Sequence, residues 1–150
     1  MTELASAQRA ILAATPSLDQ GEAPARAKIL VVDDEPKSLY ALQELLGALG
    51  QELLVAQSGE EALKLALKHD FAVILLDVRM PGMDGFETAR MIRGRERSSQ
   101  TPIIFLTAHA DEMNSMFRGY AVGAVDYLTK PVVPEVLKSK VSIFVELHMK

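Results

Sequence analysis

Five side chains that could act together in phosphoryl chemistry lie at the ends of short apolar runs in the sequence. They are Asp33, Asp34, Asp77, Thr107 and Lys130. Carboxylates brought close together repel one another and need a counter-charge. One lysine cannot balance all three, whereas Mg²⁺ binds carboxylates and water in sites of this kind. The set therefore indicates Mg²⁺-assisted transfer of a phosphoryl group to an aspartate.

Each of these residues also has a structural explanation when it is taken alone. An aspartate at a strand end is most often a turn or helix-capping residue, and a Lys-Pro pair most often begins a loop. Their joint occurrence at four strand ends favours a site, because structural needs alone would not repeat the pattern. The sequence contains no glycine-rich phosphate-binding motif of the P-loop or dinucleotide type, which argues against a nucleotide site.

Alternating strands and helices must bring these residues together. Apolar runs predict strands at residues 28–32, 53–56, 72–76, 102–106 and 127–128. Helical spacing, proline starts and one capping box predict helices at about residues 36–49, 59–68, 86–92, 112–122 and 134–147. This order predicts an α/β fold, with a doubly wound five-stranded parallel sheet and helices on both faces. In such sheets the ligand site lies beyond the carboxyl ends of the strands.

Residues 1–27 differ from the rest and predict a tail and linker, with a short helix over residues 2–14 as the alternative. The ordered domain is then predicted at residues 28–150. A net charge of −4 does not favour a nucleic-acid-binding surface. The chain has no cysteine and no apolar run of about 18 residues, and its start lacks the pattern of a signal peptide. We therefore expect a cytoplasmic protein without membrane contact.

Four stretches resemble the response-regulator receiver domain of two-component signal transduction, in that family's order and spacing. They are ILVVDDEP, VILLDVRMPGMDGFE, TPIIFLTAHA and GAVDYLTKP. The resemblance covers residues 28–147 and implies a flavodoxin-like sheet with strand order 2-1-3-4-5. It also implies a phosphorylation-dependent signalling switch with Mg²⁺ as cofactor. Such a domain has no separate turnover substrate, so we expect no enzyme in the ordinary sense.

The resemblance implies a role for each residue at the site. Asp77 would accept the phosphoryl group from a phosphohistidine on a histidine kinase or histidine phosphotransfer protein. Asp34 and Asp77 would bind Mg²⁺ through their side chains, Asp33 mainly through water, and Arg79 through its backbone carbonyl.

Three further roles follow from the same resemblance. Lys130 would pair with the phosphoryl group, and a cis peptide bond would join it to Pro131. Thr107 would donate its hydroxyl to a phosphoryl oxygen. Tyr127 would be the aromatic switch, whose ring turns inward when Thr107 moves.

Two other functions fit the sequence less well. An aspartate-nucleophile phosphatase needs a second Asp two residues after the nucleophile, and Arg79 stands there instead. A receiver-like interaction module without phosphorylation typically lacks one of the acidic residues or the lysine, and all are present here.

Several positions lead to more specific expectations. Arg79 and His109 flank the predicted route of attacking water and are expected to set the lifetime of the phosphoryl group, with a solvated loop histidine as the alternative for His109. Val132 stands where many receivers have Phe after Lys-Pro. The run PVVPEVLKSKVSIFVEL resembles receivers whose last helix continues into a following signalling module, which would lie beyond Lys150. A homodimer is expected through the fourth helix, the fifth strand and the last helix.

The arginines around the end of the third helix are interpreted as a solvated face, with a partner contact as the alternative. They are Arg90, Arg93, Arg95 and Arg97.

Overall fold

Five apolar segments form one parallel sheet whose central strands are buried on both faces. In the computed structural model, residues 25–108 and 126–150 are described. The strands are β1 (Lys28–Val32), β2 (Glu52–Ala56), β3 (Val73–Asp77), β4 (Ile103–Thr107) and β5 (Asp126–Thr129). Their order is β2-β1-β3-β4-β5, and every neighbouring pair is parallel. The predicted doubly wound sheet and its strand order are confirmed.

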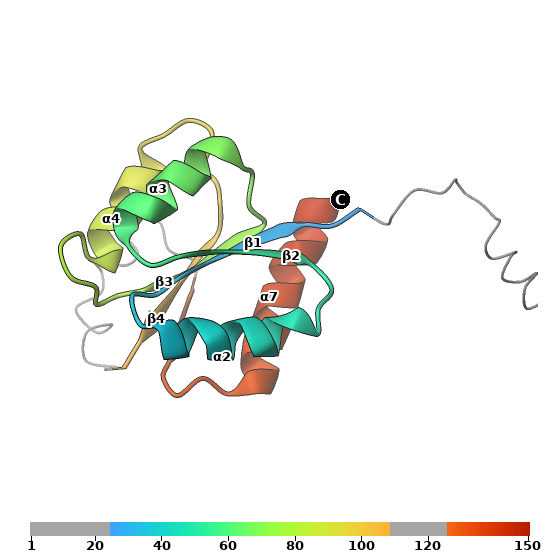
Figure 1. Ribbon diagram of the computed structural model, residues 1–150. Coiled ribbons are helices and arrows are strands. Elements are labelled where there is room, and N and C mark those ends of the chain that lie inside the picture. The colour runs from blue at the N-terminus through green and yellow to red at the C-terminus, as the bar shows by residue number, and fades with distance from the viewer. Residues whose placement is uncertain (1–24, 109–125) are drawn as a thin grey trace, which may run out of the picture.

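Helices cover both faces of this sheet. They are α2 (Pro36–Gly47), α3 (Gly59–Lys68), α4 (Gly85–Arg93) and α7 (Pro134–Met149). Figure 1 shows α3 and α4 on one face and α2 and α7 on the other. The helix predicted at residues 112–122 and the tail predicted at the N-terminus lie outside the described residues, apart from residues 25–27.

Alternating side chains divide the core into two layers. Leu30 and Val32 of β1 pack beneath α3 and α4, whereas Ile29 and Val31 pack beneath α2 and α7. This alternation is the two-residue period of a strand. The core begins one residue before β1, because Ala27 is buried and its carbonyl accepts a hydrogen bond from Glu52 N–H at 3.0 Å.

N-capping side chains and first-turn prolines explain where the described helices begin. Ser58 Oγ accepts a hydrogen bond from Glu61 N–H at 3.1 Å, and Asp84 Oδ1 accepts one from Glu87 N–H at 2.9 Å. Both are N-caps that satisfy backbone donors of the first turn. The other two helices begin with Pro36 and Pro134, since proline fits the first turn of a helix. No helix in the described ranges is long and apolar enough to cross a bilayer.

Asp77 and Thr107 end their strands, as predicted. Asp77 is paired with Leu106 as the last residue of β3, and Thr107 is paired with Thr129 as the last residue of β4. The apolar runs stop one residue earlier, but backbone pairing continues through these polar residues. Asp77 and Thr107 therefore belong to the rigid sheet and not to the loops that follow it.

Candidate functional site

A polar pocket of about 370 Å³ lies beyond the carboxyl ends of β1, β3 and β4. This is where a parallel α/β sheet holds its ligand. Its walls are formed by Asp33, Asp34, Glu35, Pro36, Asp77, Arg79, Thr107, Ala108 and Lys130. The structure thus brings together all five side chains from which the sequence analysis began.

The backbone fixes the acidic residues in this pocket. Asp33 follows β1 directly, and its N–H donates to the carbonyl of Ala56 at 3.1 Å. Its Oδ1 accepts a hydrogen bond from Glu35 N–H at 3.0 Å. Asp33 and Asp77 are buried, with 1% and 7% of their surface exposed, whereas Asp34 is exposed. Two acidic groups are therefore held in the sheet edge, and the third faces solvent.

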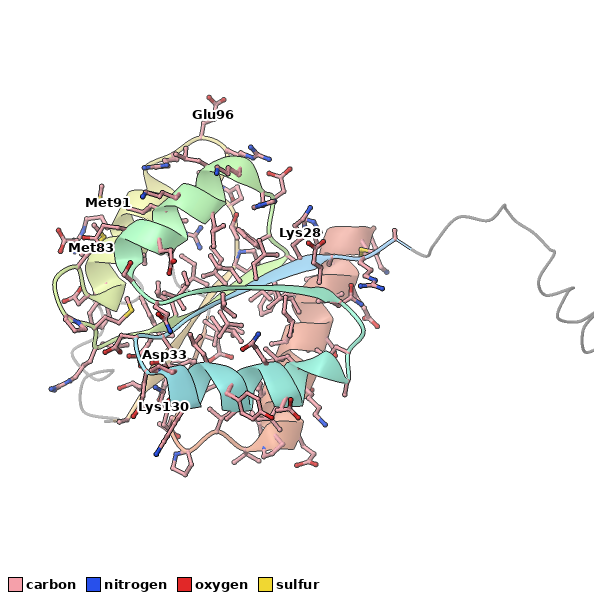
Figure 2. All side chains as sticks on the ribbon, viewed as in Figure 1. Lys28, Asp33, Met83, Met91, Glu96 and Lys130 are labelled. Carbon is pink, nitrogen blue, oxygen red and sulfur yellow. The ribbon has the colours of Figure 1, made fainter. Side chains whose placement is uncertain are left out.

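Lys130 connects the ends of two strands through one ammonium group. Its Nζ lies 2.8 Å from Asp33 Oδ2 and 3.0 Å from Asp77 Oδ1. Figure 2 shows Asp33 and Lys130 at the same end of the sheet. Burial lowers the pKa of Lys130, but the hydrogen bonds to the two carboxylates raise it more, so the net pKa is above its ordinary value. Lys130 therefore stays a cation at neutral pH.

Asp77 is the carboxylate whose protonation is most altered. Burial raises the pKa of Asp77 to about 6, against the lowering effect of the Lys130 hydrogen bond. The nearby charges of Asp33 and Asp34 add to the increase. Without a metal ion, the ionised form of Asp77 is thus disfavoured relative to that of a solvated aspartate.

The donor set fits a hard divalent cation. Asp33, Asp34 and Asp77 each offer one carboxylate oxygen, and these oxygens lie within 4.8 Å of one another. Oxygen ligands from one or two carboxylates, completed by water, are what Mg²⁺ prefers. Arg79 lines the same pocket. The role of its backbone carbonyl as a ligand stays a prediction.

The two residues predicted to form the switch lie along one ladder. Thr107 is 1% exposed and pairs with Thr129, and its carbonyl accepts a hydrogen bond from Lys130 N–H at 2.8 Å. Tyr127 lies two residues before Thr129, so its side chain is on the same face of the sheet. Tyr127 is 38% exposed and does not line the acidic pocket. His109 lies outside the described residues.

Gly85 is a residue at this site that the sequence analysis did not single out. Its N–H donates to the carbonyl of Val78 at 2.8 Å, which joins the start of α4 to the end of β3. A Cβ atom at Gly85 would lie 2.3 Å from the backbone oxygen of Asp77. The Asp-Gly pair before a helical pattern was the available signal, but it does not reveal which backbone comes close.

Two of these four arginines form hydrogen bonds that hold the loop after α4 in place. The Arg93 guanidinium donates to the carbonyls of Ser98 and Ser99, both at 3.2 Å. Arg97 pairs with Asp70 at 2.7 Å and donates to the carbonyl of Leu67 at 2.8 Å. Arg93 and Arg97 thus make contacts within the domain, which neither the solvated face nor the partner contact had predicted.

An apolar groove of about 460 Å³ adjoins the acidic pocket. It is formed by Ser38, Ala41, Leu42, Leu45, Lys130, Pro131 and Val132. Lys130 lines both the groove and the pocket, so the two are neighbours on the surface. The Lys130–Pro131 peptide bond is cis, as the family resemblance implied.

Comparison with known proteins finds a matching family and relatives that are more than a third identical to this chain over the matched residues. The response regulator receiver domain family matches residues 29–142. PilH of Pseudomonas aeruginosa is 38% identical over 74% of this chain and 91% of its own length. The transcriptional regulatory protein SrrA of Staphylococcus aureus is 41% identical over 71% of this chain but only 43% of its own length.

Solved structures agree with these relatives. The chemotaxis protein CheY4 of Vibrio cholerae has a TM-score of 0.74 and 38% identity, and the match covers 80% of this chain and 99% of that one. The receiver domain of the sensor histidine kinase PA1611 from Pseudomonas aeruginosa has a TM-score of 0.74 and 30% identity, over 81% and 99% of the two chains. That structure contains a magnesium ion coordinated in its active-site cleft. This chain belongs to the response regulator receiver domain family, whose members are signalling modules of two-component systems.

Proposed function

We propose that this domain is a phosphorylation-dependent switch in which Asp77 accepts a phosphoryl group from a phosphohistidine. The observation that carries the proposal is the position of Asp77. It is buried at the end of β3, 3.0 Å from the Lys130 ammonium group and within 4.8 Å of two further carboxylates. An acceptor for a negatively charged group needs such cationic support, because a bare acidic pocket would repel it.

The transfer step follows from this arrangement. A carboxylate oxygen of Asp77 attacks phosphorus, the phosphorus–nitrogen bond breaks, and the bond pair stays on the leaving imidazole nitrogen. Lys130 holds a phosphoryl oxygen, and the fixed sheet end aligns Asp77 with the bond that breaks. Asp34, Asp77 and Asp33 would hold Mg²⁺, with the Arg79 carbonyl as a further ligand, and the ion would neutralise charge on the transferred group. Water then hydrolyses the acyl phosphate.

The readout involves Thr107 and Tyr127. A phosphoryl group on Asp77 adds charge and three strong acceptors beside Thr107. The Thr107 hydroxyl donates to one of these oxygens, and the half-exposed Tyr127 ring turns inward on the same face of the sheet. The exposed surface around β5 changes as a result.

The apolar groove is the proposed docking site of the phosphodonor protein. A histidine kinase or phosphotransfer protein must bring its phosphohistidine to the pocket, and the groove shares Lys130 with that pocket. Leu42, Leu45 and Val132 offer apolar contacts next to the reacting groups. A helix with an apolar stripe beside the phosphohistidine fits such a groove.

A second copy of the chain is the proposed partner of the α7 face. Val136, Ile143 and Leu147 are 40%, 53% and 63% exposed and lie on one side of the helix. Together with β5 they offer an apolar surface. The fourth predicted helix of this interface lies outside the described residues. Light scattering of the phosphorylated wild-type domain and of the phosphorylated Ile143→Lys variant tests this pairing. A phosphorylated wild-type domain that stays monomeric at high concentration would contradict it.

The proposed setting is the cytoplasm, with an output module beyond Lys150 and without direct nucleic-acid binding by the domain itself.

The proposed function is tested by phosphorylation with a small phosphodonor. Wild type is incubated with acetyl phosphate, with and without Mg²⁺, and labelling is measured by intact mass. We expect Mg²⁺-dependent addition of one phosphoryl group, loss of labelling in Asp77→Asn, and about ten-fold or more slower labelling in Asp34→Ala at limiting Mg²⁺. Loss of a residue that only supports a metal ligand already costs about 10- to 100-fold in metal affinity or activity. Asp126→Asn, outside the pocket, is the control and should label normally. Labelling that survives Asp77→Asn would overturn the proposal, and an unlabelled wild type would favour a phosphorylation-independent module.

A further inference from the structure

Glu35 lies in the acidic pocket but has no role in the transfer described above. It follows Asp34 and lines the same pocket as Asp77 and Lys130. Its side chain is exposed, whereas Asp33 and Asp77 are buried. Glu35 therefore stands, with the exposed Asp34, at the mouth of the pocket.

Two hydrogen bonds fix Glu35 in this position. Its backbone N–H donates to Asp33 Oδ1 at 3.0 Å, and its Oε1 accepts a hydrogen bond from Ser38 Oγ at 3.0 Å. The second bond holds the carboxylate by a neutral partner, so it restricts the side chain and leaves its charge in place. Glu35 occupies the N-cap position of α2 without a side-chain capping bond.

No described residue forms an ion pair with Glu35. The ammonium group of Lys130 is engaged by Asp33 and Asp77. Four carboxylates line the pocket, and a single Mg²⁺ would neutralise the charge of two of them. The carboxylate of Glu35 therefore adds negative charge at the edge of the pocket, which would repel a dianion.

We propose that Glu35 is a selectivity residue that disfavours small dianionic phosphodonors at the mouth of the pocket. The proposal rests on the proposed function, since it concerns access to Asp77. A carboxylate a few ångströms from the path of a dianion repels it, and mobile ions screen this repulsion. The effect expected for an exposed group is about two- to five-fold in rate at low ionic strength. The domain would thereby respond less to small acyl phosphates than to donors with less negative charge.

Two phosphodonors with different charge test this proposal. Acetyl phosphate is largely a dianion near pH 7.5, whereas phosphoramidate carries less net negative charge because its nitrogen is protonated. The rate of labelling is measured for each at saturating Mg²⁺ in wild type and in Glu35→Gln. Both donors react with the same Asp77, so a change in Asp77 reactivity or in Mg²⁺ occupancy cancels in the ratio of the two rates.

Two further variants make the result specific. Glu44→Gln removes the same charge from an exposed position of α2 that does not line the pocket. Ser38→Ala keeps the charge of Glu35 but removes the hydrogen bond that holds it. We expect the ratio of acetyl phosphate to phosphoramidate rates to rise two- to five-fold in Glu35→Gln, to rise less in Ser38→Ala and to stay unchanged in Glu44→Gln. The difference should shrink as salt is added.

The outcomes separate the selectivity proposal from the transfer proposal. An unchanged ratio in Glu35→Gln, or an equal rise in Glu44→Gln, overturns the role of Glu35 while Asp77 remains the acceptor. Failure of both donors to label wild type overturns the proposed function itself. A change in ratio that persists at high salt would point to a steric cause and would also overturn the electrostatic proposal.

Discussion

The Lys130 ammonium group lies 3.0 Å from Asp77 Oδ1, while the same nitrogen contacts Asp33 at 2.8 Å. One cation thus separates two buried carboxylates that end neighbouring strands. The arrangement leaves more negative than positive charge among the three residues, and this excess favours the binding of a cation. The stability of the domain and its chemistry are therefore coupled through Lys130.

Replacement of Lys130 by alanine should destabilise the domain more without Mg²⁺ than with it. The variant leaves Asp33 and Asp77 facing each other without a counter-charge. Loss of one partner of a buried charged pair costs about 3–5 kcal/mol, and partial exposure of Lys130 reduces this to about 2–3 kcal/mol. Urea unfolding measures the loss, with Lys37→Ala, an exposed lysine of α2, as the control. A loss that Mg²⁺ does not diminish would show that Lys130 acts through packing instead of charge.

Replacement of Asp77 by asparagine should stabilise the domain at neutral pH in the absence of metal. Because burial raises the pKa of Asp77 to about 6, the folded state binds a proton more tightly than the unfolded state. The stabilising contribution is present below the unfolded pKa near 3.8 and is lost as pH rises through 6. The variant should gain about 1–3 kcal/mol at pH 7.5 and lose this advantage near pH 4.

Urea unfolding in a chelating buffer at several pH values measures this difference. A stability difference that grows as pH falls would mean that Lys130, and not burial, dominates the environment of Asp77.

Replacement of Gly85 by alanine should disturb both stability and phosphorylation. The new Cβ would lie 2.3 Å from the backbone oxygen of Asp77 and 2.8 Å from Val78 Cα, so α4 must move away from β3. Overpacking of this kind costs about 1–3 kcal/mol. Gly94→Ala is the matched control, because its Cβ would meet no atom closer than 3.6 Å. Equal effects of the two substitutions on unfolding and on labelling rate would disprove the role of this close approach.

Replacement of Arg79 by alanine should shorten the lifetime of the phosphoryl group. Arg79 lines the pocket beside Asp77, and its bulk is expected to obstruct attacking water. We expect dephosphorylation to be about five-fold faster, which corresponds to about 1 kcal/mol in the barrier. Arg79→Met keeps much of the bulk without the charge and should resemble wild type. If methionine accelerates the decay as much as alanine does, charge and not bulk controls the lifetime.

The sequence predicted the sheet well because its buried strands are uninterrupted apolar runs. Runs such as residues 72–76 are apolar without alternation, which identifies strands covered on both faces. The apolar runs of β3 and β4 stop at Leu76 and Leu106, because the backbone pairing of Asp77 and Thr107 leaves no trace in hydrophobicity. The strand order came from the family resemblance and not from periodicity.

The site was predicted as a set of residues but not as a set of contacts. The rule for parallel sheets places Asp33, Asp77 and Lys130 at one edge. It does not say that Lys130 divides its hydrogen bonds between two carboxylates, which depends on side-chain geometry. The close approach of Gly85 and the groove beside Val132 likewise arise from tertiary packing of elements distant in sequence.

The most direct test of the central claim is the location of the phosphoryl group in the phosphorylated domain. Reduction with borohydride converts an aspartyl phosphate into homoserine, and peptide mass spectrometry locates the product. We predict homoserine at residue 77 only, formed in the presence of Mg²⁺ and absent when Mg²⁺ is chelated. Homoserine at residue 33 or 34 in the wild-type protein, or a phosphoryl group that resists reduction, would contradict the assignment of Asp77 as acceptor.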